Sequence, residues 1–232
     1  MGCSKFYIHD HNSSIPIRQQ VAGYIATGLV EYDSSFSKAN RPQLVVYNHC
    51  IRQYSHKHKW IGMFDADEYI VVVNKTEKIP DVLRRYDAYG GVVLQWKLFG
   101  SSGHVLRPEG GILKNYNKCH KNFHIKSIVN SKYAVKAAGN AHSFKYQKGY
   151  YAVDTNYTKS VGPWHINATR TPPSYAYDVM YMNHYNLKSR ADFEAKIRRG
   201  DVTRVTPLAM SYFEDMDRLC TEDCGYLQMP SE

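Results

Sequence analysis

The sequence predicts an α/β domain with a mostly parallel sheet flanked by helices, and three observations lead to this class. Short β-rich runs alternate with helical patterns through the first hundred residues. Glycine, proline and polar turn formers separate these runs. The run 60–64 is apolar without alternation, which is typical of a central strand covered on both faces.

The individual elements follow from local signals. We expect strands at residues 5–9, 29–32, 60–64 and 92–99, and helices at residues 17–28, 42–54 and 79–89. The segment 108–149 mixes Lys, Asn and Gly and is predicted to be loop-rich, with only short strands. A strand at 180–185 leads into a helix with Ser189 as N-cap and Asp192 as its capping-box partner. We expect one domain over residues 1–206 and a tail or helical extension over residues 207–232.

Composition limits the classes of function. The chain has 232 residues, is 43% hydrophobic and carries a net charge of +9. This charge suits an anionic ligand, although a solvated basic surface is the favoured explanation. The basic residues are scattered and no nucleic-acid-binding module is present, so we expect no nucleic-acid partner. The 20 tyrosines suit packing against sugar rings while hydrogen-bonding their hydroxyls, although an ordinary core or surface role is the favoured explanation for any single tyrosine.

Cysteine usage leaves the redox state open. The chain has five cysteines, and the only close pair is Cys220 and Cys224. This pair either closes a small disulfide loop or remains as two free thiols.

Three carboxylates stand directly after the apolar run, at Asp65, Asp67 and Glu68. In an extended segment Asp65 and Asp67 point to one side and Glu68 to the other. The aspartate pair then suits one hard cation, Mn²⁺ or Mg²⁺, which stabilises the charge on a departing nucleoside diphosphate. The alternative is a solvated strand end without a metal.

The segment Trp60–Ile70 resembles the signature of glycosyltransferase family 92 and its family-2-like relatives. Further matching pieces follow in the family's order over most of residues 6–200: 6–13, 95–104, 126–129, 183–189 and 193–200. The resemblance implies a GT-A-like, Rossmann-related fold and a metal-dependent enzyme. It also implies inverting transfer of a hexose, such as galactose from UDP-galactose, to a glycan acceptor, usually with Mn²⁺.

The resemblance assigns roles to individual residues. Asp65 and Asp67 match the metal motif, with Asp67 also catalytic, and His184 matches the position of a third ligand. The alternative for His184 is a hydrogen-bonded histidine at a helix N-terminus.

Other candidates are weaker. Inverting transfer needs a base that removes the proton of the acceptor hydroxyl. The candidates for this base are His104, Glu109 and Asp154. Cofactor-binding candidates outside the metal motif are Lys126 and His142 for the pyrophosphate, and Asp10 and Asn12 for donor or acceptor. Each has a turn, core or surface role as its alternative.

The chain departs from the family pattern at its start. In relatives, a strand and helix that bind the nucleotide base precede the strand at Phe6–Ile8. We therefore expect an N-terminally truncated enzyme that lacks its first strand–helix unit and any membrane anchor. The parent protein is expected in the Golgi lumen as a type II membrane protein if eukaryotic, and in the cytoplasm if bacterial or viral.

Two other functions remain as alternatives. One is a catalytically inactive protein that binds nucleotides or carbohydrates at the retained site. The other is a metal-dependent nucleotidyltransferase, which also uses paired carboxylates but normally shows a glycine-rich phosphate loop that this sequence lacks.

Overall fold

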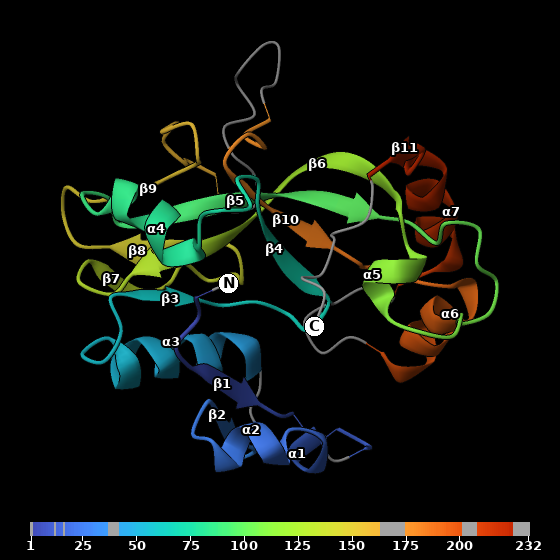
Figure 1. The fold of residues 1–232 in the computed structure, drawn as a ribbon, viewed down its shortest axis with the longest axis horizontal. Coiled ribbons are helices and arrows are strands. Elements are labelled where there is room, and N and C mark those ends of the chain that lie inside the picture. Colours follow the sequence, from blue (N-terminus) through green and yellow to red (C-terminus); the bar gives the residue numbers. More distant parts are fainter. Residues whose placement is uncertain are drawn as a thin grey trace. The chain divides into compact units, whose positions relative to one another are not determined.

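The structure, a computed structural model, describes residues 2–11, 13–15, 17–36, 42–162, 175–200 and 208–224 (Figure 1). Its elements follow in the order β1 (Phe6–His9), α1 (Ile17–Gln20), α2 (Ala22–Ala26), β2 (Val30–Asp33), α3 (Pro42–Tyr54), β3 (Trp60–Gly62), β4 (Glu68–Val72), α4 (Ile79–Leu83), η1 (Arg84–Tyr86), β5 (Gly91–Phe99), α5 (Ile112–Asn115), β6 (Lys118–Asn130), β7 (Ala134–Ala137), β8 (Phe144–Tyr146), β9 (Ala152–Val153), β10 (Met180–His184), α6 (Arg190–Arg199), α7 (Met210–Leu219) and β11 (Glu222–Asp223). None of these helices is long and apolar enough to cross a membrane.

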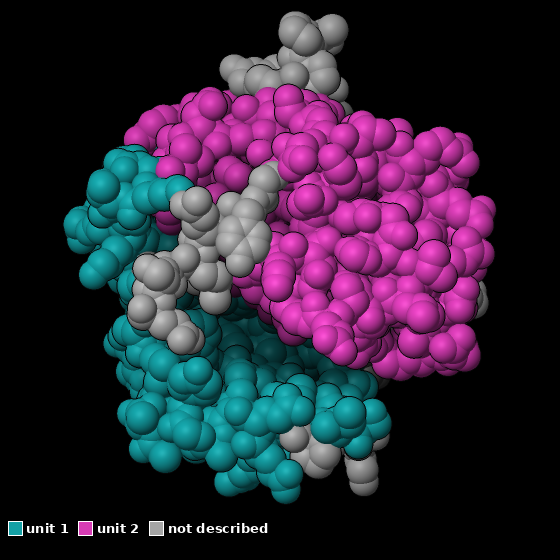
Figure 2. All heavy atoms as spheres, turned by 45° about the vertical axis from the view of Figure 1, so that its right-hand side comes forward, with its two compact units in different colours: residues 1–63, 74–93, 127–153 teal, residues 64–73, 94–126, 154–232 magenta. Residues whose placement is uncertain are grey.

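The chain forms two compact units, which Figure 2 shows in different colours. The first unit contains Met1–Met63, Asn74–Val93 and Ser127–Val153. The second contains Phe64–Val73, Leu94–Lys126 and Asp154–Glu232.

In the first unit, parallel β1 and β2 are joined through α1 and α2, as the alternating pattern predicted. β3 pairs antiparallel with the last residues of β6, and β9 pairs parallel with the first residues of β5. The core forms where α3 packs its buried side chains, including Tyr47 and Ile51, against Val129 and Phe144. A side chain at Gly91 would collide with the Tyr146 hydroxyl at 2.5 Å, so this strand start needs glycine.

In the second unit the strands lie in the order β11-β6-β5-β10-β4. β10 pairs parallel with β5 and antiparallel with β4, and β11 pairs antiparallel with β6. Helices α6 and α7 pack on each other through Phe193 and Phe213, which share a buried cluster with Leu187 and Leu208. The expected α/β class is confirmed, and the sheet contains both parallel and antiparallel pairs.

Two local predictions were wrong. β6 is a strand of 13 residues inside the segment predicted to be loop-rich. Its first half carries Lys, His and Asn, which disfavour strands intrinsically, but pairing with β11 outweighs this preference. The run at 60–64 forms only the three-residue β3, which is partly exposed rather than covered on both faces.

The predicted helix and its Ser189 N-cap are confirmed, but the capping box is incomplete, because the Ser189 backbone N–H donates to the Tyr116 hydroxyl and not to Asp192. The Ser189 hydroxyl accepts a hydrogen bond from the Asp192 backbone N–H at 3.1 Å and donates to the Asp192 carboxylate at 2.7 Å. Gly200 ends the helix with a φ of 81°, a left-handed conformation that glycine adopts at little cost.

The C-terminal segment is tied back to the sheet. Cys224 forms a disulfide with Cys119 of β6 rather than with Cys220, which is a buried thiol that donates to the Leu98 carbonyl at 3.4 Å. A local Cys220–Cys224 loop is therefore not formed. The expected domain boundary at 206/207 lies outside the described residues, and the helix after it is α7.

We expect Cys119→Ser to lower the free energy of unfolding by about 2–5 kcal/mol, because the disulfide joins residues 105 positions apart and restricts the unfolded chain. Chemical denaturation with and without reductant measures the loss. Cys3→Ser, which removes an exposed thiol, is the control and should leave stability unchanged. Equal stability of wild type and Cys119→Ser under oxidising conditions would contradict this role.

Candidate active site

The aspartate pair lies in a turn between two strands. β3 ends at Gly62 and β4 begins at Glu68, and the Glu68 N–H donates to the Asp65 carbonyl at 3.1 Å. The extended geometry assumed from the sequence is therefore wrong, and side-chain alternation does not apply to Asp65 and Asp67. Glu68 does not point away, because its Oε2 atom accepts a hydrogen bond from the Asp65 N–H at 3.0 Å.

The pairing of β4 with β10 places His184 beside this turn. In the antiparallel register, His184 lies directly opposite Glu68. The Tyr185 N–H then donates to the Asp67 carbonyl at 2.9 Å, which fixes the backbone of the turn. Residues far apart in the sequence thus form one site within the second unit.

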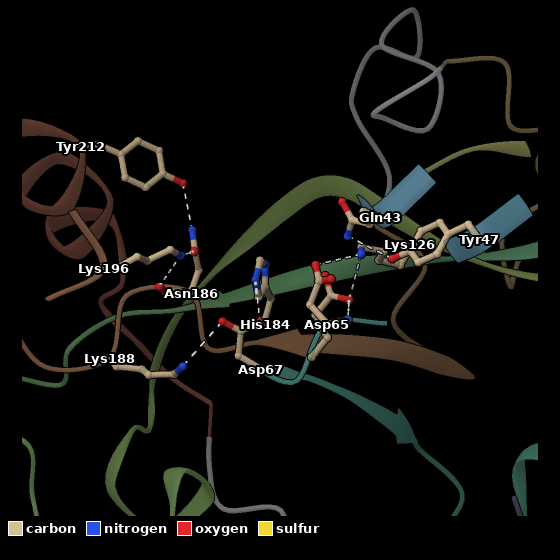
Figure 3. A network of polar contacts seen from close by, with 11 residues as sticks. Gln43, Tyr47, Asp65, Asp67, Lys126, His184, Asn186, Lys188, Lys196 and Tyr212 are labelled. Atoms are coloured by element: carbon tan, nitrogen blue, oxygen red, sulfur yellow. Dashed lines mark hydrogen bonds and ion pairs between the residues drawn. The ribbon is translucent and has the colours of Figure 1, made fainter. Parts of the chain in front are cut away.

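Asp67 has a basic group at each carboxylate oxygen. The His184 Nε2 atom lies 3.6 Å from Oδ1, and the Lys188 Nζ atom lies 3.6 Å from Oδ2. Figure 3 shows both side chains pointing toward Asp67. Burial opposes ionisation of Asp67, but the nearby His184 imidazole and the Lys188 ammonium outweigh it. The pKa of the carboxyl is therefore well below its ordinary value.

Lys126 joins the other two carboxylates. Its ammonium lies 3.0 Å from Asp65 Oδ2 and 3.3 Å from Glu68 Oε2. The side chains of Lys126 and Glu68 are 1% and 0% exposed, whereas that of Asp65 is 45% exposed. Burial raises the pKa of Glu68, and the nearby Lys126 charge opposes this rise. The sequence assigned Lys126 to a pyrophosphate, and the structure places it on Asp65 and Glu68.

Two buried polar atoms of the site have no hydrogen-bond partner among the residues that the structure describes. These atoms are Glu68 Oε1 and His184 Nδ1. Buried polar groups in folded proteins nearly always have a partner, so unmade bonds mark a place where a ligand or water is expected. The His184 ring is held in place by an edge-to-face contact with Trp96 at 4.2 Å.

The donor set partly fits a divalent cation. Asp67 and His184 offer a carboxylate and an imidazole that lie close together, a combination that suits Mn²⁺. Asp65 contacts Lys126 and is not drawn into a compact group with them. Among the described residues, three potential ligand atoms come within 4.8 Å of one another only at Cys119, Glu222 and Cys224, where the two sulfurs form the disulfide.

The base candidates have different surroundings. The His104 Nε2 atom lies 3.1 Å from the Asn115 carbonyl, so this nitrogen carries the proton. Asp154 is 2% exposed and its Oδ1 accepts from the N–H groups of Asn156 and Thr158, which is a turn-forming role. Glu109 is exposed.

The remaining candidates belong to the first unit or lie outside the described residues. The Asp10 carboxylate accepts hydrogen bonds from the Ser13 N–H at 2.9 Å and the Tyr32 hydroxyl at 2.6 Å. The His142 N–H donates to Asn140 Oδ1, and its carbonyl accepts from Ser127. Asn12 lies outside the described residues. The contacts described for Asp10 and His142 lie within the first unit.

Lys188 is a site residue that sequence reasoning missed. It lies four residues after His184, just before the helix N-cap, and its φ of 59° is a left-handed conformation unusual for lysine. No sequence signal for positive φ exists at a lysine, so only the fold reveals its direction.

Comparison with known families gives the class of protein. The model of glycosyltransferase family 92 matches residues 1–204, most of the chain. The chain therefore belongs to glycosyltransferase family 92, as the resemblance predicted, and is a glycosyltransferase that moves a sugar from a donor to a glycan acceptor. Comparison with curated proteins gives no match.

We expect Lys126→Met to lower the free energy of unfolding by about 3–5 kcal/mol, because it leaves the Glu68 carboxylate buried without its charge partner. Chemical denaturation measures the change. The double variant Lys126→Met/Glu68→Met should recover most of the loss.

A matched control is Lys59→Met. It removes a lysine from the exposed pair with Asp87 and should change stability by about 1 kcal/mol or less. Equal effects of Lys59→Met and Lys126→Met would show that burial of the Lys126–Glu68 pair has no energetic consequence.

Proposed function

We propose that this chain is a metal-dependent inverting glycosyltransferase that moves a hexose, such as galactose, from a UDP-sugar to a glycan acceptor. The observation that carries the proposal is Asp67, a mostly buried and ionised carboxylate with an imidazole on one oxygen and an ammonium on the other. Family membership supports the transfer reaction, and the site supports its metal dependence.

Asp67 and His184 hold the cation in this proposal, and oxygens of the donor diphosphate complete the ligand set. A bound Mn²⁺ or Mg²⁺ supplies positive charge to the diphosphate leaving group. The contacts of Trp96 with His184, and of the Tyr185 N–H with Asp67, orient the ligands before the cation binds.

The reaction is a direct displacement at the anomeric carbon. A base removes the proton of the acceptor hydroxyl, whose oxygen attacks the anomeric carbon while the bond to the diphosphate breaks. Most of the rate enhancement then comes from positioning and from fixed charges in the site.

Among the base candidates we favour Glu109. The Nε2–H group of His104 donates to a carbonyl and Asp154 is buried in its turn, whereas the Glu109 side chain is exposed to solvent. His104 remains in this proposal as a positioning group for the loop that ends β5.

The proposal includes a GT-A-like arrangement, in which ligands bind beyond the carboxyl ends of parallel strands. The parallel pairs β1–β2 and β5–β10 support this arrangement. The Cys119–Cys224 disulfide supports an oxidising compartment such as the Golgi lumen.

We expect Asp67→Ala to lower kcat/KM at least about 100-fold and to abolish the effect of Mn²⁺ on UDP binding, because the cation loses its most constrained ligand. Transfer assays and calorimetric titration of UDP with and without Mn²⁺ measure both effects. The control is Asp215→Ala, which removes an exposed carboxylate on α7. Metal-dependent binding of UDP that persists in Asp67→Ala would refute the metal site.

For the base, we expect Glu109→Gln to lower kcat about 100-fold or more with little change in KM, because the substitution keeps the shape but removes the proton acceptor. His104→Asn should have a smaller effect on kcat. Steady-state kinetics at saturating donor separate the two. If His104→Asn causes the larger loss of kcat, the assignment of the base to Glu109 is wrong.

A further inference from the structure

The Lys188 backbone is locked in an unfavourable conformation at the edge of the site. Its φ of 59° costs energy in a residue with a β-carbon. Its two neighbours hold it there, since Leu187 is 1% exposed within a hydrophobic cluster and Ser189 is fully buried. The Ser189 N–H donates to the Tyr116 hydroxyl at 3.1 Å and its hydroxyl caps α6. Strain that the surroundings impose in this way is concentrated at functional positions.

The strained backbone directs the Lys188 side chain toward Asp67. The Lys188 ammonium lies 3.6 Å from Asp67 Oδ2, longer than a direct hydrogen bond of about 2.7–3.2 Å. The side chain is 31% exposed, so the ammonium reaches both the carboxylate and solvent. Lys126 differs, because it is 1% exposed and is committed to Asp65 and Glu68.

A cation at Asp67 and the Lys188 ammonium carry like charges and compete for the same carboxylate. An anion that binds both the cation and the Lys188 ammonium removes this competition, because the ammonium then has another negative partner. Ammonium groups are strong phosphate ligands, because they supply full positive charge and three N–H donors.

We propose that Lys188 is a donor-binding residue whose ammonium binds the diphosphate of the nucleotide sugar. This inference rests on the proposed function and deepens it by naming the protein group that contacts the leaving group. Once the cation occupies Asp67, the Lys188 side chain turns from the carboxylate to a phosphate oxygen. It then balances the negative charge that builds up on the diphosphate as the sugar departs.

The test is calorimetric titration of UDP and of inorganic pyrophosphate, each with Mn²⁺, against wild type and variants. We expect Lys188→Met to weaken binding of both ligands about 10-fold to 100-fold, the range for a lost charge-assisted hydrogen bond. Lys188→Arg should retain most of the affinity. The control Lys114→Met removes an exposed lysine on α5 in the same unit and should bind both ligands as wild type does.

Lys188→Gly separates binding from folding. Glycine accepts positive φ without strain, so this variant should melt no lower than Lys188→Met while losing the same affinity. Loss of affinity together with retained melting temperature supports a ligand-binding role. Wild-type affinity for pyrophosphate in Lys188→Met and Lys188→Gly overturns it.

The outcomes distinguish this inference from the proposed function. If wild type transfers sugar and binds UDP but the Lys188 variants bind equally well, the inference fails and the function stands. If wild type binds pyrophosphate through Lys188 but neither binds UDP nor uses UDP-sugars, the donor assignment fails and the role of Lys188 stands. Absence of binding of both ligands to wild type overturns both.

Discussion

The register of β4 against β10 is the constraint on which the site depends. It places His184 opposite Glu68 and lets the Tyr185 N–H reach the Asp67 carbonyl. A shift of one residue would turn His184 to the other face of the sheet, because side chains alternate along a strand. Backbone pairing of β4 with β10 therefore fixes the positions of the site residues. The charged contacts form between side chains that the sheet already holds close together.

Helix α7 lies beyond the family match, which ends at residue 204, and it also supports the residues around the site. Asp217 of α7 accepts hydrogen bonds from the Ser101 N–H at 2.6 Å and the Ser101 hydroxyl at 2.8 Å. A side chain at Gly100 would lie 2.6 Å from Asp217, so glycine permits this approach. On the other side of α7, the Tyr212 hydroxyl accepts from Asn186, two residues before Lys188 (Figure 3). The C-terminal helix thus supports both the loop after β5 and the segment that carries Lys188.

The sequence predicted what local signals encode. The N-cap at Ser189 and the apolar run of β5 depend on neighbouring residues, and both were predicted correctly. The β6 strand pairs with a segment distant in the sequence, so propensity misjudged it. The Asp65–Glu68 turn is closed by local hydrogen bonds that the assumed strand geometry did not include, and Tyr185 fixes it from a distance. Motif matching singled out Asp67 and His184, which the fold brings together. It could not find Lys188, because positive φ at a lysine leaves no trace in the sequence.

The structure shows which positive groups neutralise the three carboxylates Asp65, Asp67 and Glu68. The sequence predicted that a metal ion neutralises the aspartate pair. The structure supplies two ammonium groups instead: Lys126 neutralises buried Glu68 and contacts Asp65, and Lys188 faces Asp67. Only the second of these is exposed enough to move aside. On the proposed function, a cation at Asp67 takes the place of the Lys188 ammonium, and the buried Lys126–Glu68 pair keeps the turn in place.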